Sequence, residues 1–245
     1  RRRLIVFLED GARPDYLFLN SSVLRWKPFF SNLLKSDPKH TVCSTMKVDP
    51  PTSTTQGVKT LLTGGMRSFL ELGQTFFSSS LTSDHWLRQL KSYRNLSIAH
   101  TGDYVWRELG GDVFSNDLKE SDSFDVYVDD TEDIQEALES FVTSTTDVLI
   151  IHSLLVDHNA HRTSTSSPSH HAIYDALLKF NKHLSYITSH LPTNTLLLVF
   201  GDHGLSAWGN HGGATYDEVT TGICAYSSSY ELQPFTVGES FFYSS

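Results

Sequence analysis

TLLLVFGDHG, residues 195–204, places a run of apolar residues directly before a glycine, an aspartate, a histidine and a second glycine. A short apolar run that does not alternate with polar residues is typical of a strand buried on both faces of a parallel sheet. Asp202 and His203 would then follow the carboxyl end of this strand, where such sheets bind their ligands. The stretch therefore predicts a parallel sheet with its chemistry at one edge.

The rest of the chain repeats this pattern. Apolar runs predict further strands at 3–9, 96–100, 147–155 and 222–227. Helical spacing of apolar residues predicts helices at 54–63, 83–93, 131–143 and 168–191. Because strands and helices alternate, we expect an α/β fold with a mainly parallel β-sheet sandwiched between helices. The length of 245 residues, without an internal repeat, predicts a single domain spanning 1–245.

Charge, sequons and cysteines bear on the partners and the cellular compartment of the protein. The formal net charge of -9, without clustered Lys and Arg, argues against nucleic acid as a partner. The start at Arg1, directly before a strand, predicts a domain cut from a longer protein. Asn20 and Asn95 begin sequons that would accept glycans in a lumenal compartment. Cys43 and Cys224 are too few to indicate a compartment.

Aspartate and histidine residues follow three of the predicted strands, and one more histidine lies in a glycine-rich segment. They are Asp10, Asp157, His161, Asp202, His203 and His211. Asp157 and His161, four residues apart, would share one face of a helical turn. Carboxylates combined with imidazoles suit zinc or another borderline divalent ion, whereas calcium and magnesium prefer oxygen ligands. The set is large enough for two metal ions with positions left open for substrate.

The segment DPPTSTTQGVKTLLTGG, residues 49–65, offers a nucleophile. Its two prolines predict an extended entry, and Thr52 falls where the helix would begin. A hydroxyl there feels the positive end of the helix dipole, and two neighbouring cations would favour loss of its proton. Thr52 is therefore the predicted nucleophile, with a helix N-cap as its structural alternative.

These residues resemble the alkaline phosphatase superfamily and, within it, the GPI ethanolamine phosphate transferases. The order Asp10, Thr52, Asp157, His161, Asp202, His203 and His211 matches the superfamily pattern. The motifs similar to those of the transferases are DGARPD (10–15), the proline–threonine segment, GDYVW (102–106), LLVDHNAH (154–161) and GDHGLSAWGNHGG (201–213). The DPP entry and the GGATYDEV tail (212–219) look most like the types acting on the third or second mannose.

The resemblance implies a reaction and a setting. The enzymes move phosphoethanolamine from phosphatidylethanolamine to a mannose of the GPI-anchor precursor, through a phospho-threonine that would form on Thr52. Two zinc ions are implied, one held by Asp157, His161 and His211 and the other by Asp10, Asp202 and His203. The chain would be a catalytic domain in the endoplasmic reticulum lumen, attached to a multi-spanning membrane portion. A membrane partner subunit is compatible with this setting.

Several departures and alternatives stay open at this point. Ala160 stands where the family often has Gly, Arg67 where a Pro is common, and the loop at 161–171 is unusually rich in Ser and Thr. Ligand type alone does not exclude manganese. A hydrolytic phosphodiesterase or nucleotide pyrophosphatase would use the same metal set with water as acceptor. A catalytically silent binding domain is the alternative outside enzymes.

Overall fold

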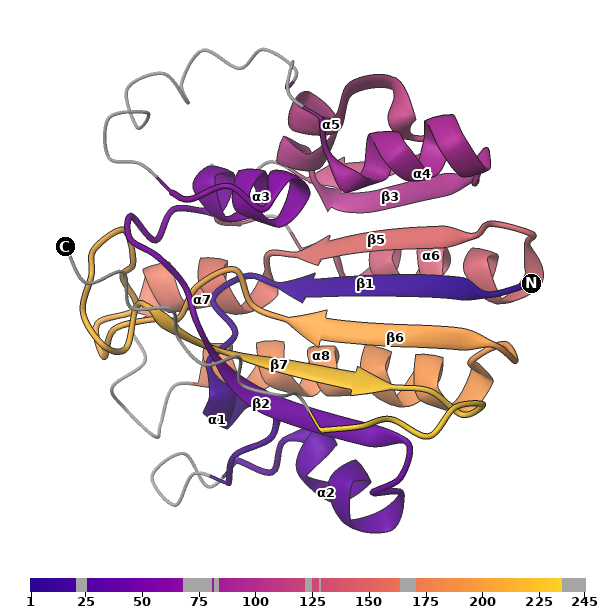
Figure 1. Cartoon of the computed structure of the whole chain (residues 1–245). Coiled ribbons are helices and arrows are strands. Elements are labelled where there is room, and N and C mark those ends of the chain that lie inside the picture. Colours follow the sequence, from indigo (N-terminus) through magenta and orange to yellow (C-terminus); the bar gives the residue numbers. More distant parts are fainter. Residues whose placement is uncertain are drawn as a thin grey trace, which may run out of the picture.

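The computed structural model describes residues 1–20, 26–67, 81, 84–121, 125–127, 129–163 and 171–234, and a seven-stranded sheet forms its centre (Figure 1). The strands are β1 (Arg3–Glu9), β2 (Thr41–Lys47), β3 (Ile98–Asp103), β4 (Asn116–Ser121), β5 (Val148–Ser153), β6 (Thr195–Phe200) and β7 (Thr220–Tyr226). Their order is β2-β7-β6-β1-β5-β3-β4. All neighbouring pairs are parallel except those that β7 makes with β6 and β2. The predicted mainly parallel sheet is confirmed.

Helices cover both faces of this sheet. They are α1 (Pro14–Leu17), α2 (Phe29–Ser36), α3 (Thr54–Thr63), α4 (Trp86–Arg94), α5 (Val105–Gly110), α6 (Thr131–Thr143), α7 (Leu155–Thr163) and α8 (His171–His190), with a short 3-10 helix η2 at Gly111–Val113. One core packs α6 and α8 against the sheet, and a second core packs α3, α4 and α5 against its other face. The predicted sandwich is therefore present.

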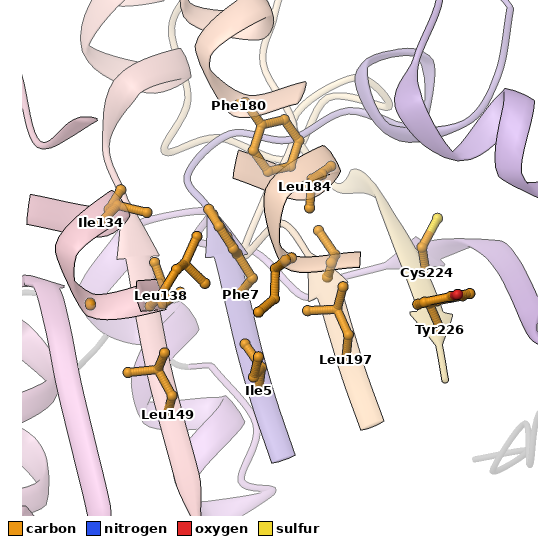
Figure 2. Packing of buried hydrophobic residues seen from close by; sticks show 14 of the residues in the cluster. Ile5, Phe7, Ile134, Leu138, Leu149, Phe180, Leu184, Leu197, Cys224 and Tyr226 are labelled. Atoms are coloured by element: carbon orange, nitrogen blue, oxygen red, sulfur yellow. The ribbon is translucent and has the colours of Figure 1, made fainter. Parts of the chain in front are cut away.

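Strand β1 shows why the apolar runs do not alternate. Ile5 and Phe7 point into the core with α6 and α8, and Phe7 meets the ring of Phe180 edge-on at 5.4 Å between centroids (Figure 2). Val6 and Leu8 point into the opposite core. Burying each such side chain contributes about 1.5–3 kcal/mol. Both faces of β1 are therefore stabilised by burial, as the sequence predicts.

Two strands and several boundaries differ from the prediction. The edge strands β2 and β4 were not predicted, because they lack a continuous apolar run. The apolar run at 147–155 ends as a strand at Ser153, and its last residues pass into α7. The Ser/Thr-rich loop predicted to begin at 161 is still helical to Thr163, and residues 164–170 lie outside the described ones.

The two cysteines form a disulfide between the edge strand β2 and its neighbour β7. Cys43 and Cys224 face each other in the register of this pair and are 181 residues apart in sequence. Sequence reasoning did not predict this pairing, because it depends on two strands meeting across most of the chain. Among the described helices, none is both long and apolar enough to cross a bilayer.

Candidate metal centre and active site

The predicted ligands converge because three neighbouring parallel strands end at the same edge of the sheet (Figure 1). Strand β1 lies between β5 and β6. Asp10 directly follows β1, Asp157 lies in the first turn of α7 after β5, and Asp202 and His203 follow β6. Strand order therefore brings together residues from three distant parts of the sequence.

Helix α7 is held at its start by side chains from β1 and β5. The backbone N–H of Val156 donates to Oε1 of Glu9 at 3.0 Å, and that of Leu155 donates to Oγ of Ser153 at 3.4 Å. The first N–H groups of a helix have no partner within it, so these bonds satisfy them. They also fix the direction in which α7 presents Asp157 and His161.

Asp10, Asp202 and His203 form a buried group whose ligand atoms lie within 4.8 Å of one another. Nε2 of His203 lies 3.2 Å from Oδ1 of Asp10 and 3.4 Å from Oδ2 of Asp202. With its proton on Nδ1, His203 donates to the carbonyl oxygen of Gly204 at 3.0 Å. Its Nε2 then presents a lone pair toward both carboxylates, the arrangement of a metal-binding histidine.

A second group contains Asp157, His203 and His211, again within 4.8 Å. Nε2 of His211 lies 3.5 Å from Oδ1 of Asp157, while its Nδ1 lies 2.6 Å from the carbonyl oxygen of Thr52, to which it donates when protonated there. Nε2 of His161 lies 3.2 Å from Oδ2 of Asp157, so His161 borders this group. The rings of His203 and His211 stack at 3.9 Å between centroids. His203 thus belongs to both groups, whereas the resemblance assigned it to one metal.

Several ligand atoms of these groups are buried without a hydrogen-bond partner among the described residues. They are Oδ1 of Asp10, Oδ1 of Asp157, Oδ2 of Asp202 and Nε2 of His203. Buried polar atoms are almost always paired in folded proteins. Unpaired carboxylate oxygens and an imidazole lone pair facing one point are what a divalent cation needs, so the residues fit a metal ion.

The electrostatics of the group favour a positive charge at its centre. Burial would raise the pKa of Asp10, but His203 and His152 hold it well below its usual range. Burial and the neighbouring Asp10 raise the pKa of Asp202. Although burial opposes it, Asp202 and Asp10 raise the pKa of His203 to about 10. A metal ion at this point would replace the proton that the carboxylates otherwise hold on His203.

Two threonines of the proline–threonine segment differ in burial and in hydrogen-bond partners. Thr52 is fully buried; its hydroxyl donates to the carbonyl oxygen of Gly213 at 3.0 Å and accepts from the N–H of Gly212 at 2.8 Å. Thr54, the first residue of α3, is only half-buried, and its hydroxyl donates to Oδ2 of Asp10 at 3.2 Å. The structure therefore places the hydroxyl of Thr54, and not that of Thr52, against the candidate metal ligand Asp10. Sequence could have indicated Thr54 as the first residue of the predicted helix.

Arg67, treated as a departure from the family pattern, is buried beside the metal groups. Its Nη2 donates to the carbonyl oxygen of Asp202 at 2.6 Å and its Nη1 to that of Pro51 at 3.3 Å. Gly57 allows the close approach of α3, since a Cβ there would lie 3.0 Å from Cβ of Asp202. Arg67 and Gly57 thus join the nucleophile segment to the metal segment, and no sequence signal in a single chain identifies them.

Sequence comparison with known proteins finds relatives that carry the same family name. No protein-family model matches the chain. The chain is 30% identical over 233 residues to GPI ethanolamine phosphate transferase 3 of Schizosaccharomyces pombe, covering 92% of this chain and 25% of that protein. With the catalytic subunit of GPI ethanolamine phosphate transferase 3 of Mus musculus it shares 33% identity over 239 residues, covering 92% and 21%. This chain is homologous to the GPI ethanolamine phosphate transferases.

The type-2 transferases are also relatives. The catalytic subunit of the Homo sapiens GPI ethanolamine phosphate transferase 2 is 27% identical over 242 residues, covering 95% of this chain and 24% of that protein. The chain thus spans about a quarter of the length of the transferases that it matches. The resemblance to the GPI ethanolamine phosphate transferases noted in the sequence is confirmed as homology to proteins named transferase 2 and transferase 3.

Solved structures show the fold. The periplasmic domain of Escherichia coli EptC, also solved in complex with Zn, has a TM-score of 0.59 at 12% identity over 92% of this chain and 72% of its own. Murine ectonucleotide pyrophosphatase/phosphodiesterase 5 has a TM-score of 0.58 at 19% identity, covering 83% and 57%. The integral membrane phosphoethanolamine transferase EptA of Neisseria meningitidis has 0.58 at 12%, covering 94% and 48%. The fold of this transferase homologue is alkaline-phosphatase-like.

Proposed function

We propose that the chain is the catalytic domain, residues 1–245, of a GPI ethanolamine phosphate transferase of the third- or second-mannose type. It would move phosphoethanolamine from phosphatidylethanolamine to a mannose hydroxyl of the GPI-anchor precursor. The observation that carries the proposal is the group of unpaired ligand atoms at the ends of β1, β5 and β6 in a homologue of these transferases. Such a group suits phosphoryl transfer.

Two zinc ions would occupy the site. Asp10, Asp202 and His203 would hold one, and Asp157, His161 and His211 the other, with His203 between them. When bound, the ions would stabilise negative charge on the phosphate oxygens and lower the pKa of a coordinated hydroxyl. The mixture of imidazole and carboxylate ligands suits zinc, and manganese is the alternative that metal analysis would detect.

We infer that Thr54 is the nucleophile in place of Thr52. Its side chain is only half-buried, its hydroxyl contacts the proposed ligand Asp10, and it lies at the N-terminus of α3. Thr52 instead fixes the loop that carries His211, through its bonds to Gly212 and Gly213. In this proposal the hydroxyl of Thr52 orients the loop, and that of Thr54 meets the substrate.

The chemistry is a double displacement on phosphorus. The Thr54 oxygen forms a bond to phosphorus as the bond to the diacylglycerol oxygen breaks, and the threonine proton passes to the leaving alcohol. A mannose hydroxyl then forms the new phosphodiester, and its proton returns to Thr54. Each step exchanges one P–O bond for another, so no further reactant is needed.

The relatives and the disulfide support the proposed setting. The matched transferases are about four times longer than the chain, which supports a domain carried by a larger membrane protein. Their designation as catalytic subunits supports a partner subunit. The Cys43–Cys224 disulfide suits an oxidising compartment such as the endoplasmic reticulum lumen.

The decisive experiment maps the covalent intermediate. Zinc-loaded chain is incubated briefly with phosphatidylethanolamine vesicles, and intact mass is followed by peptide mapping. We expect a phosphoethanolamine adduct on Thr54, absent in Thr54→Ala and retained in Thr52→Ala. An adduct on Thr52, or an unchanged adduct in Thr54→Ala, would overturn the assignment of the nucleophile.

Metal content tests the ligand set separately. His203 belongs to both groups, so His203→Ala should lose both ions, whereas His161→Ala should retain the ion held by Asp10, Asp202 and His203. Full zinc content in both variants contradicts the ligand set. A chain that binds no zinc at all would instead support a silent binding domain.

A hydrolytic phosphodiesterase is the second candidate, favoured by the shared fold of the murine pyrophosphatase/phosphodiesterase. It would use the same residues and pass the phosphoryl group to water. Product analysis with and without a mannose acceptor separates the two. Formation of free phosphoethanolamine alone, even with acceptor in excess, would favour the hydrolase.

A further inference from the structure

Three buried side chains from separate elements form a line that ends at the proposed metal ligand Asp10. Trp106 lies on α5, His152 on β5 and Asp10 directly after β1, and their exposed fractions are 0%, 0% and 1%. Nε1 of Trp106 lies 3.0 Å from Nδ1 of His152. Nε2 of His152 lies 3.2 Å from Oδ2 of Asp10. The line therefore connects the GDYVW motif to the metal site.

The indole determines where the imidazole carries its proton. An indole N–H donates and never accepts, so Nδ1 of His152 must accept and carries no proton. In a neutral imidazole the proton then sits on Nε2. That N–H donates to Oδ2 of Asp10. Trp106 and Asp10 thus favour the same tautomer of His152, with Nδ1 as acceptor and Nε2 as donor.

The two oxygens of Asp10 consequently have different roles. Oδ2 accepts from His152 and also from the hydroxyl of Thr54 at 3.2 Å. Oδ1 has no hydrogen-bond partner among the described residues and lies 3.2 Å from Nε2 of His203. The hydrogen bonds from His152 and Thr54 therefore orient the carboxylate so that one oxygen is left for a cation.

A third metal ion is the rival interpretation of the same residues, since Asp10, Asp103 and His152 also lie within 4.8 Å of one another. The hydrogen bonds argue against it. Both nitrogens of His152 are already engaged, and the N–H of Trp106 would point its positive end at a cation bound to Nδ1. Oδ1 of Asp103 accepts from the N–H of Val105 at 3.0 Å, while its Oδ2 lies 3.9 Å from Nδ1 of His152, beyond hydrogen-bond distance. These hydrogen bonds suit the orientation of the Asp10 carboxylate better than the binding of a third cation.

We propose that Trp106 and His152 are positioning residues of the metal centre. Trp106 holds His152 in its Nε2–H tautomer, and His152 holds Asp10 with Oδ1 toward the metal ions. The inference rests on the metal centre of the proposed function and is independent of the donor and acceptor. Partners that orient a metal ligand typically change metal affinity 10–100-fold when they are removed.

The first experiment reads the tautomer directly. Nitrogen-15 NMR of the histidine-labelled, metal-free chain reports which imidazole nitrogen carries the proton, and the His152 signals are identified by their loss in His152→Gln. We expect Nδ1 to be unprotonated and Nε2 protonated in the wild type, and partial protonation of Nδ1 in Trp106→Phe, where the indole N–H no longer occupies that nitrogen. A wild-type His152 protonated on Nδ1 overturns the proposal.

The second experiment measures zinc affinity by competition with a chelator. Trp106→Phe keeps an aromatic ring and removes the N–H, and we expect zinc affinity to fall about 10–100-fold. The matched control is Trp26→Phe, because Trp26 is also buried and donates to the carbonyl oxygen of Tyr16 at 3.2 Å, outside the metal groups. Equal affinities in the two variants contradict the proposal.

A double-mutant cycle covers the case in which Trp106→Phe loses its fold. His152→Gln offers an amide N–H to Asp10 without needing a tautomer, so it should bind zinc within a few-fold of the wild type, whereas His152→Leu should lose affinity. In the His152→Gln background, Trp106→Phe should cost no further zinc affinity. A loss as large as in the wild-type background would assign Trp106 a purely structural role.

The outcomes separate this inference from the proposed function. A wild type that binds two zinc ions with variants equal to it overturns the positioning role and leaves the metal centre intact. A third zinc ion per chain that is lost in His152→Gln would favour the rival site. A wild type without zinc affinity overturns both.

Discussion

Arg67 is a buried cation that holds two carbonyl oxygens from segments far apart in the sequence. One belongs to Pro51, directly before the two threonines, and the other to the metal-ligand residue Asp202. Burial lowers the pKa of its guanidinium, while Asp202 and Asp49 oppose that effect. Because a guanidinium stays charged in proteins, both hydrogen bonds are charge-assisted.

Replacement of Arg67 should therefore destabilise the site. Arg67→Ala leaves two carbonyl oxygens without donors, and we expect the free energy of unfolding to fall by about 2–4 kcal/mol. Arg67→Lys should recover only part of this loss, because an ammonium group cannot span both carbonyls with a planar fork. Denaturant unfolding of the two variants measures the difference. A fully stable Arg67→Ala would show that the segments hold together without it.

At the scale of elements, a glycine in β3 allows this strand to pack closely against β5. Gly102 pairs with His152 in the register of the two strands, beside a bulge, and has φ +99°. A Cβ at this position would lie 1.9 Å from the carbonyl oxygen of His152. The backbone of the GDYVW motif can therefore approach the strand that carries His152 only if position 102 has no side chain.

Two glycine variants separate strain from collision. Gly102→Ala meets the carbonyl of His152, and we expect a loss of more than about 3 kcal/mol in unfolding free energy. Gly64→Ala has a similar positive φ of +71° at the end of α3 but no atom within 4 Å of the added Cβ, so it should cost only about 1 kcal/mol. Thermal or denaturant unfolding compares them. Equal losses would mean that backbone strain alone matters.

The junction between β5 and α7 contains a buried carboxyl group from Asp130, the residue before α6. Asp130 precedes α6, and its Oδ2 accepts from the N–H of Leu154 at 3.0 Å. Burial raises the pKa of Asp130 to about 7 from an ordinary value of 3.8. Between these values the folded chain holds a proton that the unfolded chain has released, so stability from this group falls as pH rises from about 4 to 7.

Asp130→Asn removes this pH dependence and keeps an oxygen that accepts from Leu154. We expect the unfolding free energy of the variant, relative to the wild type, to rise by up to about 4 kcal/mol between pH 4 and pH 7. Denaturant unfolding across this range gives the measurement. A constant difference between variant and wild type would show that Asp130 is ionised in the folded chain throughout.

At the scale of the whole molecule, the metal centre joins segments that the chain brings together from residues 10 to 211. A cation that binds only the folded chain stabilises the whole fold, since the unfolded chain has no preformed site. The buried carboxylates would otherwise lie close together without a compensating charge. Metal binding and global stability should therefore be coupled.

Metal removal tests this coupling. Treatment of the zinc-loaded chain with a chelator should lower its Tm by on the order of 10 °C, which corresponds to about 4 kcal/mol of lost binding free energy. The variant His203→Ala should have a Tm that the chelator leaves unchanged. Calorimetry with and without chelator makes the comparison. An unaffected wild type would separate metal binding from folding.

The amino-acid sequence by itself determined the architecture and identified the candidate metal ligands. Continuous apolar runs identify strands buried on both faces, and helical spacing identifies helices such as α3 and α6 with their bounds, because burial acts on local pattern. Acid and histidine side chains directly after those runs indicate a metal site for the same reason. The edge strands β2 and β4 escaped prediction because an edge position removes the need for an apolar run.

Tertiary structure decided what depends on distances between segments. The sequence offers the hydroxyls of both Thr52 and Thr54, and only the packing of α3 buries one against Gly213 and leaves the other on Asp10. The Cys43–Cys224 pair, the Arg67 bridge and the line from Trp106 through His152 arise in the same way. The spacing of apolar residues along the chain shows which side chains the hydrophobic effect will bury, so it can be read from the sequence. Hydrogen bonds between distant segments form only after the sheet has brought those segments together.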